Sequence, residues 1–189
     1  MVRVFEWLSV PLLVVPVTAN VLWLLVDASG TSRLWFIVFL VNVVFSPLIS
    51  IIWLERRRFV SDLDLRNKRE RLAFLGLMVL VSVVNAFDAW VLSAPRVIQV
   101  LDLLVLSLVL SMGAISAFWK ISIHLLVLTA VITVAYLVKG PQSLAWLPLL
   151  PLVAFHRVYF RHHTLGQVLA GASLGFIVSF LVVKLVGLS

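Results

Sequence analysis

Long runs of apolar residues are the feature that most constrains how this chain folds. Leu34–Leu54, Leu72–Ser93 and Leu165–Leu188 are each close to the ~20 residues that a helix needs to cross a bilayer. The chain is 63% hydrophobic and 12% charged, whereas soluble domains are about 45–50% apolar and about 25% charged. The sequence therefore predicts an integral-membrane protein built from helices and argues against a water-soluble globule.

The apolar runs predict an all-α, polytopic bundle of six to seven transmembrane helices in a single domain covering residues 1–189. The expected spans are Trp7–Val26, Leu34–Leu54, Leu72–Ser93, Val97 to about Trp119, Ile121–Val138, Leu144–Phe155 extended through Phe160, and Leu165–Leu188. The sixth segment decides between six and seven spans, because it is short and contains Pro148 and Pro151. No internal repeat or linker interrupts the pattern.

The distribution of basic residues predicts the orientation and the partners of the chain. With seven crossings, eleven of the 15 Lys and Arg residues share one face and four lie on the other, which points the richer face to the cytoplasm. The formal net charge is +7. In a chain this apolar, the excess indicates cytoplasmic loops, anionic membrane lipids or an anionic substrate, and not nucleic acid. Cysteine is absent, which excludes disulfides and thiolate chemistry.

Several polar residues fall inside or beside the apolar runs and have ordinary structural explanations. Asp88 and Asp102 each lie a few residues from the turn between the third and fourth spans, so we expect both side chains to reach the membrane interface. A second group is expected to form hydrogen bonds between helices and consists of Asn42, Ser46, Ser50 and Asn85.

A first cluster of polar groups opens the fifth expected span, where Lys120, Ser122 and His124 lie within five residues. The N-terminus of a helix presents backbone N–H groups and a partial positive charge, which together suit a phosphate. We expect Lys120 and Ser122 to bind phosphoryl oxygens there. His124 lies slightly deeper and could donate a proton to a leaving oxygen.

A second cluster joins the last two expected spans and contains His156, Arg157, His162, His163 and Gln167. His163 and Gln167 are four residues apart, so they share one face of a helix and can form a hydrogen bond. A side-chain oxygen bound to one imidazole nitrogen fixes the tautomer and leaves the other nitrogen as a nucleophile or base.

Both clusters and the basic stretch Arg66–Arg71 fall on one membrane face, which indicates a site for an anionic group, most simply a phosphate. Taken singly, a His or Arg at a helix end is usually an interfacial anchor, and a basic loop usually sets topology. A metal site built from His124, His162 and His163 is an alternative. No Asp, Glu or Cys stands beside them at ligand spacing, so we predict neither a metal nor a cofactor.

The spacing of the second cluster resembles the third signature of the phosphatidic-acid phosphatase type 2 superfamily. That signature is Ser-Arg, five residues, His, three residues and Asp. Here His156-Arg157, five residues, His163, three residues and Gln167 fit the frame, and the chain continues to Gly171 in the family's usual manner. The neutral Gln167 replaces the family's Asp, and this change together with the pattern around it resembles the dolichyl-diphosphatase branch.

The second signature of the superfamily, Pro-Ser-Gly-His, is similar to Ile-Ser-Ile-His here, which keeps Ser122 and His124. The first signature, Lys followed by six residues and Arg-Pro, is absent. Arg71 heads the third span and is the arginine we assign to phosphate binding, while Lys120 could supply the missing lysine's charge. The resemblance covers residues 66–175, which would be the part that carries the site.

The resemblance implies a metal-independent membrane lipid phosphatase acting on a polyprenyl or other lipid phosphate or diphosphate. His163 would form a phosphohistidine, Gln167 would orient it, and His124 would protonate the leaving group. The phosphate-binding residues would be Arg157, Ser122, Lys120 and Arg71. Two alternatives stay open: a catalytically weak or inactive protein that binds lipid phosphates, and a metal-dependent membrane hydrolase.

Overall fold

The computed structural model describes residues 18, 30–61, 65 and 67–187, and these residues form helices and loops without any strand. The all-α prediction is therefore confirmed for this part of the chain. Of the first expected span, Trp7–Val26, all but Thr18 lies outside the described residues. The chain divides into two compact units, one containing Val26–Lys120 and the other containing Ile121–Ser189. The single-domain assignment stays a prediction.

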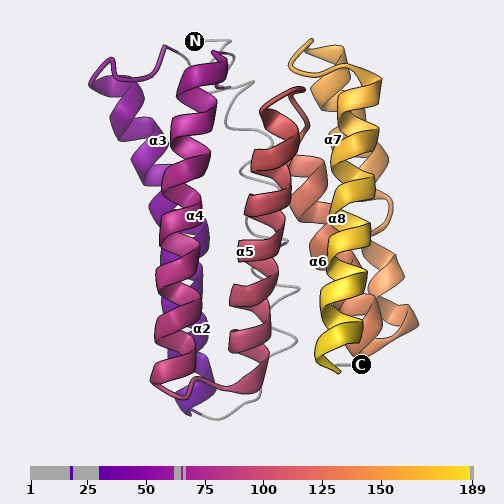
Figure 1. Ribbon diagram of the computed structural model, residues 1–189. Coiled ribbons are helices and arrows are strands. Elements are labelled where there is room, and N and C mark those ends of the chain that lie inside the picture. The colour runs from indigo at the N-terminus through magenta and orange to yellow at the C-terminus, as the bar shows by residue number, and fades with distance from the viewer. Residues whose placement is uncertain (1–17, 19–29, 62–64, 66, 188–189) are drawn as a thin grey trace. The chain divides into compact units, whose positions relative to one another are not determined.

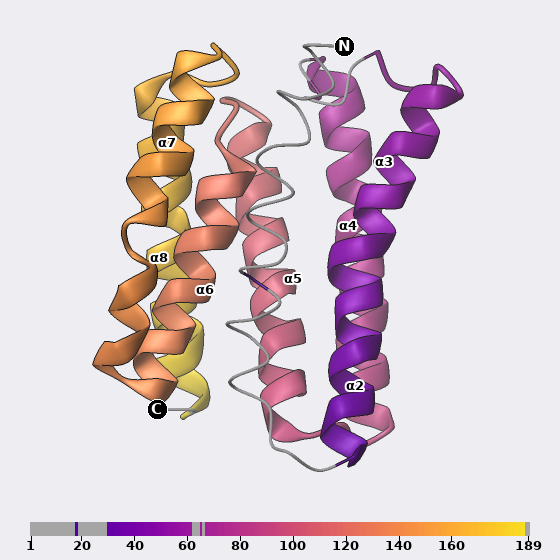
Figure 2. The ribbon, with the colours of Figure 1, turned by 180° about the vertical axis from the view of Figure 1, so that it is seen from behind.

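In the unit Val26–Lys120, the first described element is a helical run that covers the expected span Leu34–Leu54. The run consists of α2 (Gly30–Leu40), the π-helical η1 (Val41–Phe45) and α3 (Ser46–Arg56), and Figure 2 shows α2 and α3 following one another along a single path. Pro47 explains the π-helical segment, because it has no N–H to donate to the carbonyl of Val43 and its ring crowds that carbonyl.

The next two helices, α4 (Lys68–Val91) and α5 (Arg96–Ser116), pack against one another in an antiparallel hairpin (Figure 1). Asn67 caps α4 by accepting a hydrogen bond from the N–H of Arg69 at 3.0 Å. The chain reverses where Ser93 has a φ of 52°, and Pro95 precedes the first turn of α5. The turn predicted between the third and fourth spans is thus present.

The unit Ile121–Ser189 is built around α6 (Ile123–Lys139). It continues through the 3₁₀ helix η2 (Pro141–Trp146), α7 (Leu149–Tyr159) and α8 (Leu165–Val186), and α8 runs alongside α6 (Figures 1 and 2). Apolar side chains of α6, α7 and α8 form a common core, of which Leu128, Val153 and Val168 are fully or almost fully buried.

The expected sixth segment, Leu144–Phe155, is not one continuous helix. It divides at Leu147 and Pro148 into η2 and α7, because Pro148 cannot donate a backbone hydrogen bond to a helix that precedes it. Pro151 is accommodated in the first turn of α7, where a backbone N–H would have no partner within the helix. The other expected spans in the described part coincide with helices to within a few residues at each end.

Three helices in the described part, α4, α5 and α8, are long and apolar enough to cross a membrane. Two shorter apolar helices accompany them, Ser32–Val43 and Ile123–Lys139. Large apolar side chains are exposed along α4 and α8, including Leu80 at 60%, Phe87 at 60% and Leu169 at 57%. Exposed apolar surface of this extent is typical of helices that face an apolar partner.

Candidate functional site

Two glycines of α8 place its first turns directly against the start of α6. A Cβ added at Gly171 would lie 2.4 Å from the carbonyl oxygen of Ser122, and one added at Gly175 would lie 2.3 Å from that of Leu126. Small residues four apart allow two helix backbones to approach this closely. The backbone N–H of Ser122 also donates to the carbonyl of Gln167 at 3.1 Å, so the N-terminal ends of α6 and α8 are joined.

The loop between α7 and α8 is closed by the backbone of Arg157. Its carbonyl accepts hydrogen bonds from the N–H groups of His162 and His163, both at 3.1 Å, and Arg161 takes a φ of 56° to allow the turn. The side chains of Arg157 and His163 are 2% and 7% exposed. The loop thus holds a buried guanidinium and a buried imidazole on residues whose backbones are hydrogen-bonded to each other.

Gln167 has two tasks at the start of α8. Its Oε1 accepts the backbone N–H of Thr164 at 3.1 Å, while its own N–H donates to the Oγ1 of Thr164 at 3.3 Å, which is a capping box. The same Oε1 lies 3.2 Å from Nδ1 of His163. The predicted hydrogen bond is therefore present, but its partners do not share a helix as expected, because His163 precedes the N-cap Thr164 and only Gln167 belongs to α8.

This arrangement determines which ring nitrogen of His163 carries the proton. The N–H of Thr164 requires an acceptor, so the atom of Gln167 that it meets is the oxygen and not the amide nitrogen. Because that oxygen can only accept, Nδ1 of His163 must be the donor across the 3.2 Å contact. In the neutral ring Nε2 then has no proton and keeps the lone pair that a nucleophile or base requires.

The N-terminus of α6 is the second part of the site. Ser122 is the N-cap residue, yet its side chain makes no capping hydrogen bond. It is completely buried, and its Oγ has no hydrogen-bond partner among the described residues. His124 is half-buried in the first turn of the same helix. An oxyanion at this end could accept from the Ser122 hydroxyl and from the first backbone N–H groups of α6.

The charges of this segment all have one sign. Residues 121–189 contain every histidine of the chain, four Lys or Arg residues and no Asp or Glu. The residue that meets His163, Gln167, is neutral, so no carboxylate of this segment stands beside the ring. The segment therefore attracts anions without local carboxylate repulsion.

The remaining two predicted phosphate-binding residues, Arg71 and Lys120, belong to the other unit. The guanidinium of Arg71 is buried and donates to the carbonyls of Leu65 at 3.1 Å and Ser116 at 3.2 Å. Ser116 ends α5, where a cation favourably meets the carbonyl end of the helix dipole. Arg71 thus has a structural task, and its assignment to phosphate stays a prediction, as does that of Lys120.

Some side chains differ from the sequence-based expectations or add to them. Asp102 is only 5% exposed because neighbouring side chains of its unit surround it, whereas Asp88 is exposed, and the expected position of both at the membrane interface stays a prediction. His124, His162 and His163, the histidines of the alternative metal site, do not gather into a group of three. Within the described ranges no set of three His, Cys, Asp or Glu side chains could hold a metal ion. Thr164 was not among the predicted residues, although Thr-x-x-Gln before an apolar run is the sequence mark of a capping box.

Replacing Gln167 tests the tautomer directly. In Gln167→Leu the Oε1 acceptor is lost, so we expect the proton of neutral His163 to redistribute between the two nitrogens and the helix cap to weaken by about 1 kcal/mol. Gln167→Glu keeps an acceptor at the same position and should keep the proton on Nδ1. The ¹⁵N chemical shifts of the His163 ring distinguish the two states, and an unchanged spectrum in Gln167→Leu would contradict the assignment.

Comparisons of the chain with protein-family models, with curated proteins and with solved structures find no match. The resemblance to the phosphatidic-acid phosphatase type 2 superfamily therefore rests on the residues named above, and the function that it implies is a proposal.

Proposed function

We propose that this chain is a multi-pass membrane lipid phosphatase, with six to seven spans, that hydrolyses a polyprenyl or other lipid phosphate or diphosphate. The observation that carries the proposal is the bond between Nδ1 of His163 and Oε1 of Gln167, which leaves Nε2 as the nucleophilic nitrogen. The three long apolar helices and their exposed apolar side chains support the membrane part, since a lipid tail needs such surroundings.

In the first half-reaction, Nε2 of His163 attacks phosphorus, and the bond between phosphorus and the lipid oxygen (or the leaving phosphate oxygen) breaks. The proton that this oxygen needs comes from His124. The buried guanidinium of Arg157, the hydroxyl of Ser122 and the first N–H groups of α6 bind the phosphoryl oxygens and stabilise the charge that develops on them.

In the second half-reaction, His124 accepts a proton from water, and the resulting hydroxide attacks the phosphohistidine. The bond from phosphorus to Nε2 breaks, inorganic phosphate leaves, and His163 returns to its neutral form with the proton on Nδ1. Arg71 and Lys120 are proposed as further cations for phosphate, and the active-site face is proposed to be cytoplasmic on the count of basic residues.

One observation favours a second candidate, a protein that binds lipid phosphates with little or no turnover. Gln167 can orient His163, but a neutral amide does not stabilise the positive charge that the ring acquires when it attacks phosphorus. The binding groups, Arg157 and Ser122 with the start of α6, do not depend on that charge.

A phosphate-release assay in detergent separates the candidates. The purified chain is offered prenyl phosphates, prenyl diphosphates and diacylglycerol phosphate, with and without EDTA. The proposal expects release of inorganic phosphate that EDTA leaves unchanged. Binding of a prenyl phosphate without release would establish the second candidate. Activity that EDTA removes and zinc restores would establish a metal-dependent membrane hydrolase and overturn the proposal.

A further inference from the structure

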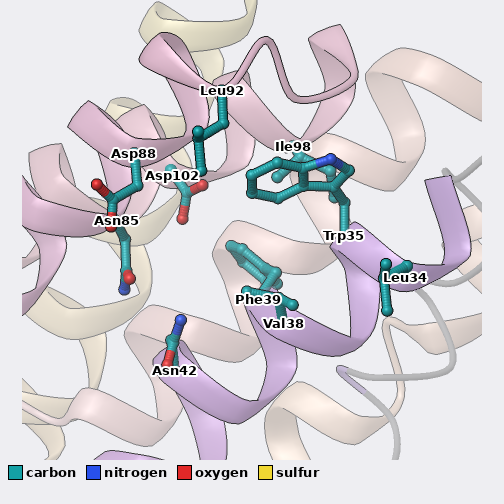
Figure 3. A pocket seen from close by; sticks show the side chains of 10 residues that line it. All are labelled: Leu34, Trp35, Val38, Phe39, Asn42, Asn85, Asp88, Leu92, Ile98 and Asp102. Atoms are coloured by element: carbon teal, nitrogen blue, oxygen red, sulfur yellow. The ribbon is translucent and has the colours of Figure 1, made fainter. Parts of the chain in front are cut away.

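A pocket of about 330 Å³ lies within the unit Val26–Lys120, among α2, η1, α4 and α5. Figure 3 shows that two kinds of side chain line it. Polar groups come from Asn42 of η1, Asn85 and Asp88 of α4 and Asp102 of α5, while α2 contributes aromatic rings that include Trp35 and Phe39. These residues take no part in the proposed phosphatase chemistry.

The carboxyl group of Asp102 is the feature of this pocket that requires a partner. The residue is 5% exposed and points into the pocket, and it makes no hydrogen bond or ion pair with any residue that the structure describes (Figure 3). It lies six residues into α5, about 9 Å from the start of that helix. A carboxylate at such a place is costly unless a cation or hydrogen-bond donors meet it.

Two polar residues of α4, Asn85 and Asp88, add a further carboxyl group and an amide to the pocket beside Asp102. Asn85 and Asp88 are three residues apart on α4, so they present their side chains to the pocket from one face of the helix. The amide nitrogen of Asn85 is buried and has no hydrogen-bond partner among the described residues. The pocket thus offers negative charge, amide oxygens and an amide N–H of Asn85 that can donate a hydrogen bond to a ligand oxygen.

The aromatic and apolar lining favours an organic cation over a metal ion. Phe39 is 4% exposed and Trp35 is half-buried, and the faces of such rings attract a cation, most strongly when water is excluded. Two carboxylates and two amides reach the minimum of six oxygen ligands for a calcium ion only if both carboxylates bind through two oxygens, and 330 Å³ far exceeds the space of a bare ion. We infer that this pocket binds a small organic ammonium ion, with Asp102 as the counter-charge and the aromatic rings around the alkyl groups.

Choline and its uncharged carbon isostere, 3,3-dimethyl-1-butanol, provide a matched pair of probes. Binding to the full chain is measured by calorimetry in a maltoside detergent, which carries no ammonium group. Choline should bind at least tenfold more tightly than the isostere, and sodium at the same concentration should not displace it. Equal binding of the two probes, absence of choline binding, or displacement by sodium would each overturn the inference.

Variants then test the role of Asp102. Asp102→Asn should weaken choline binding at least tenfold, whereas Glu55→Gln, which removes an exposed carboxylate of α3 in the same unit, should leave it unchanged. Unaltered binding in Asp102→Asn would contradict the assignment. If that variant does not fold, the comparison of choline with its isostere on the unmodified chain still decides. Neither result depends on phosphatase activity, so this inference and the proposed function can fail separately.

Discussion

Substitution of His163 by Ala should abolish phosphate release from lipid phosphates, with a loss of at least about 10³-fold. The reason is that Nε2 of His163 is the atom that forms the bond to phosphorus in the proposed reaction. Binding of the lipid phosphate should survive, because Arg157 and the start of α6 are unchanged. The measurement is release of inorganic phosphate over time, with binding of a non-hydrolysable lipid phosphonate measured in parallel.

His162→Ala is the matched control for this variant. His162 is adjacent in sequence, half-buried, and stacks on His156 with ring centroids 6.5 Å apart. Its backbone N–H donates a hydrogen bond to the same carbonyl of Arg157 as that of His163, so the two residues belong to the same hydrogen-bonded loop. Activity should be retained in His162→Ala. If His163→Ala still released phosphate in the presence of EDTA, the assignment of His163 as the nucleophile would be refuted, whichever lipid phosphate was hydrolysed.

The sequence anticipated those structural features that depend on local chemistry. Apolar runs of sufficient length predicted the helices of the described part. The spacing of His163 and Gln167 predicted their hydrogen bond, but the expected reason was wrong, because His163 lies in the loop before the N-cap Thr164 and does not share a helix with Gln167. The capping box at Thr164 belongs to the same class, and its pattern was visible in the sequence. Such features need no knowledge of how distant segments pack.

Features that depend on packing between segments could not be predicted in the same way. Asp102 is close to a helix end, which favours an interfacial side chain, but the neighbouring helices of its unit enclose it. Arg71 was assigned to phosphate because it begins a span, yet its guanidinium meets the carbonyl of Ser116, 45 residues away. Burial and partner choice at these positions are decided by the contact between helices, which spacing along one helix does not encode.

A methyl group added to Gly171 should disrupt the joining of α6 and α8 and with it the site. The Cβ of Gly171→Ala would lie 2.4 Å from the carbonyl oxygen of Ser122, a backbone atom that cannot turn aside as a side chain could. The helices must then separate, which weakens the bond from the Ser122 N–H to the Gln167 carbonyl. We expect a loss of about 1–3 kcal/mol in stability, and a larger loss in Gly171→Leu.

Thermal unfolding in detergent measures this effect, and two other helical glycines provide its controls. Nothing lies within 4 Å of a Cβ added at Gly76 or Gly113, so Gly76→Ala and Gly113→Ala remove the same conformational freedom without a clash. Both should unfold at or slightly above the temperature of the unmodified chain, since alanine favours the helix by up to about 1 kcal/mol. If Gly171→Ala unfolded at the same temperature as these controls, the close approach of α6 and α8 would be refuted. That approach holds Ser122 against the backbone of Gln167, whose side chain meets His163. The Ala variant should therefore lose phosphate release as well as stability, whereas the two control variants should lose neither.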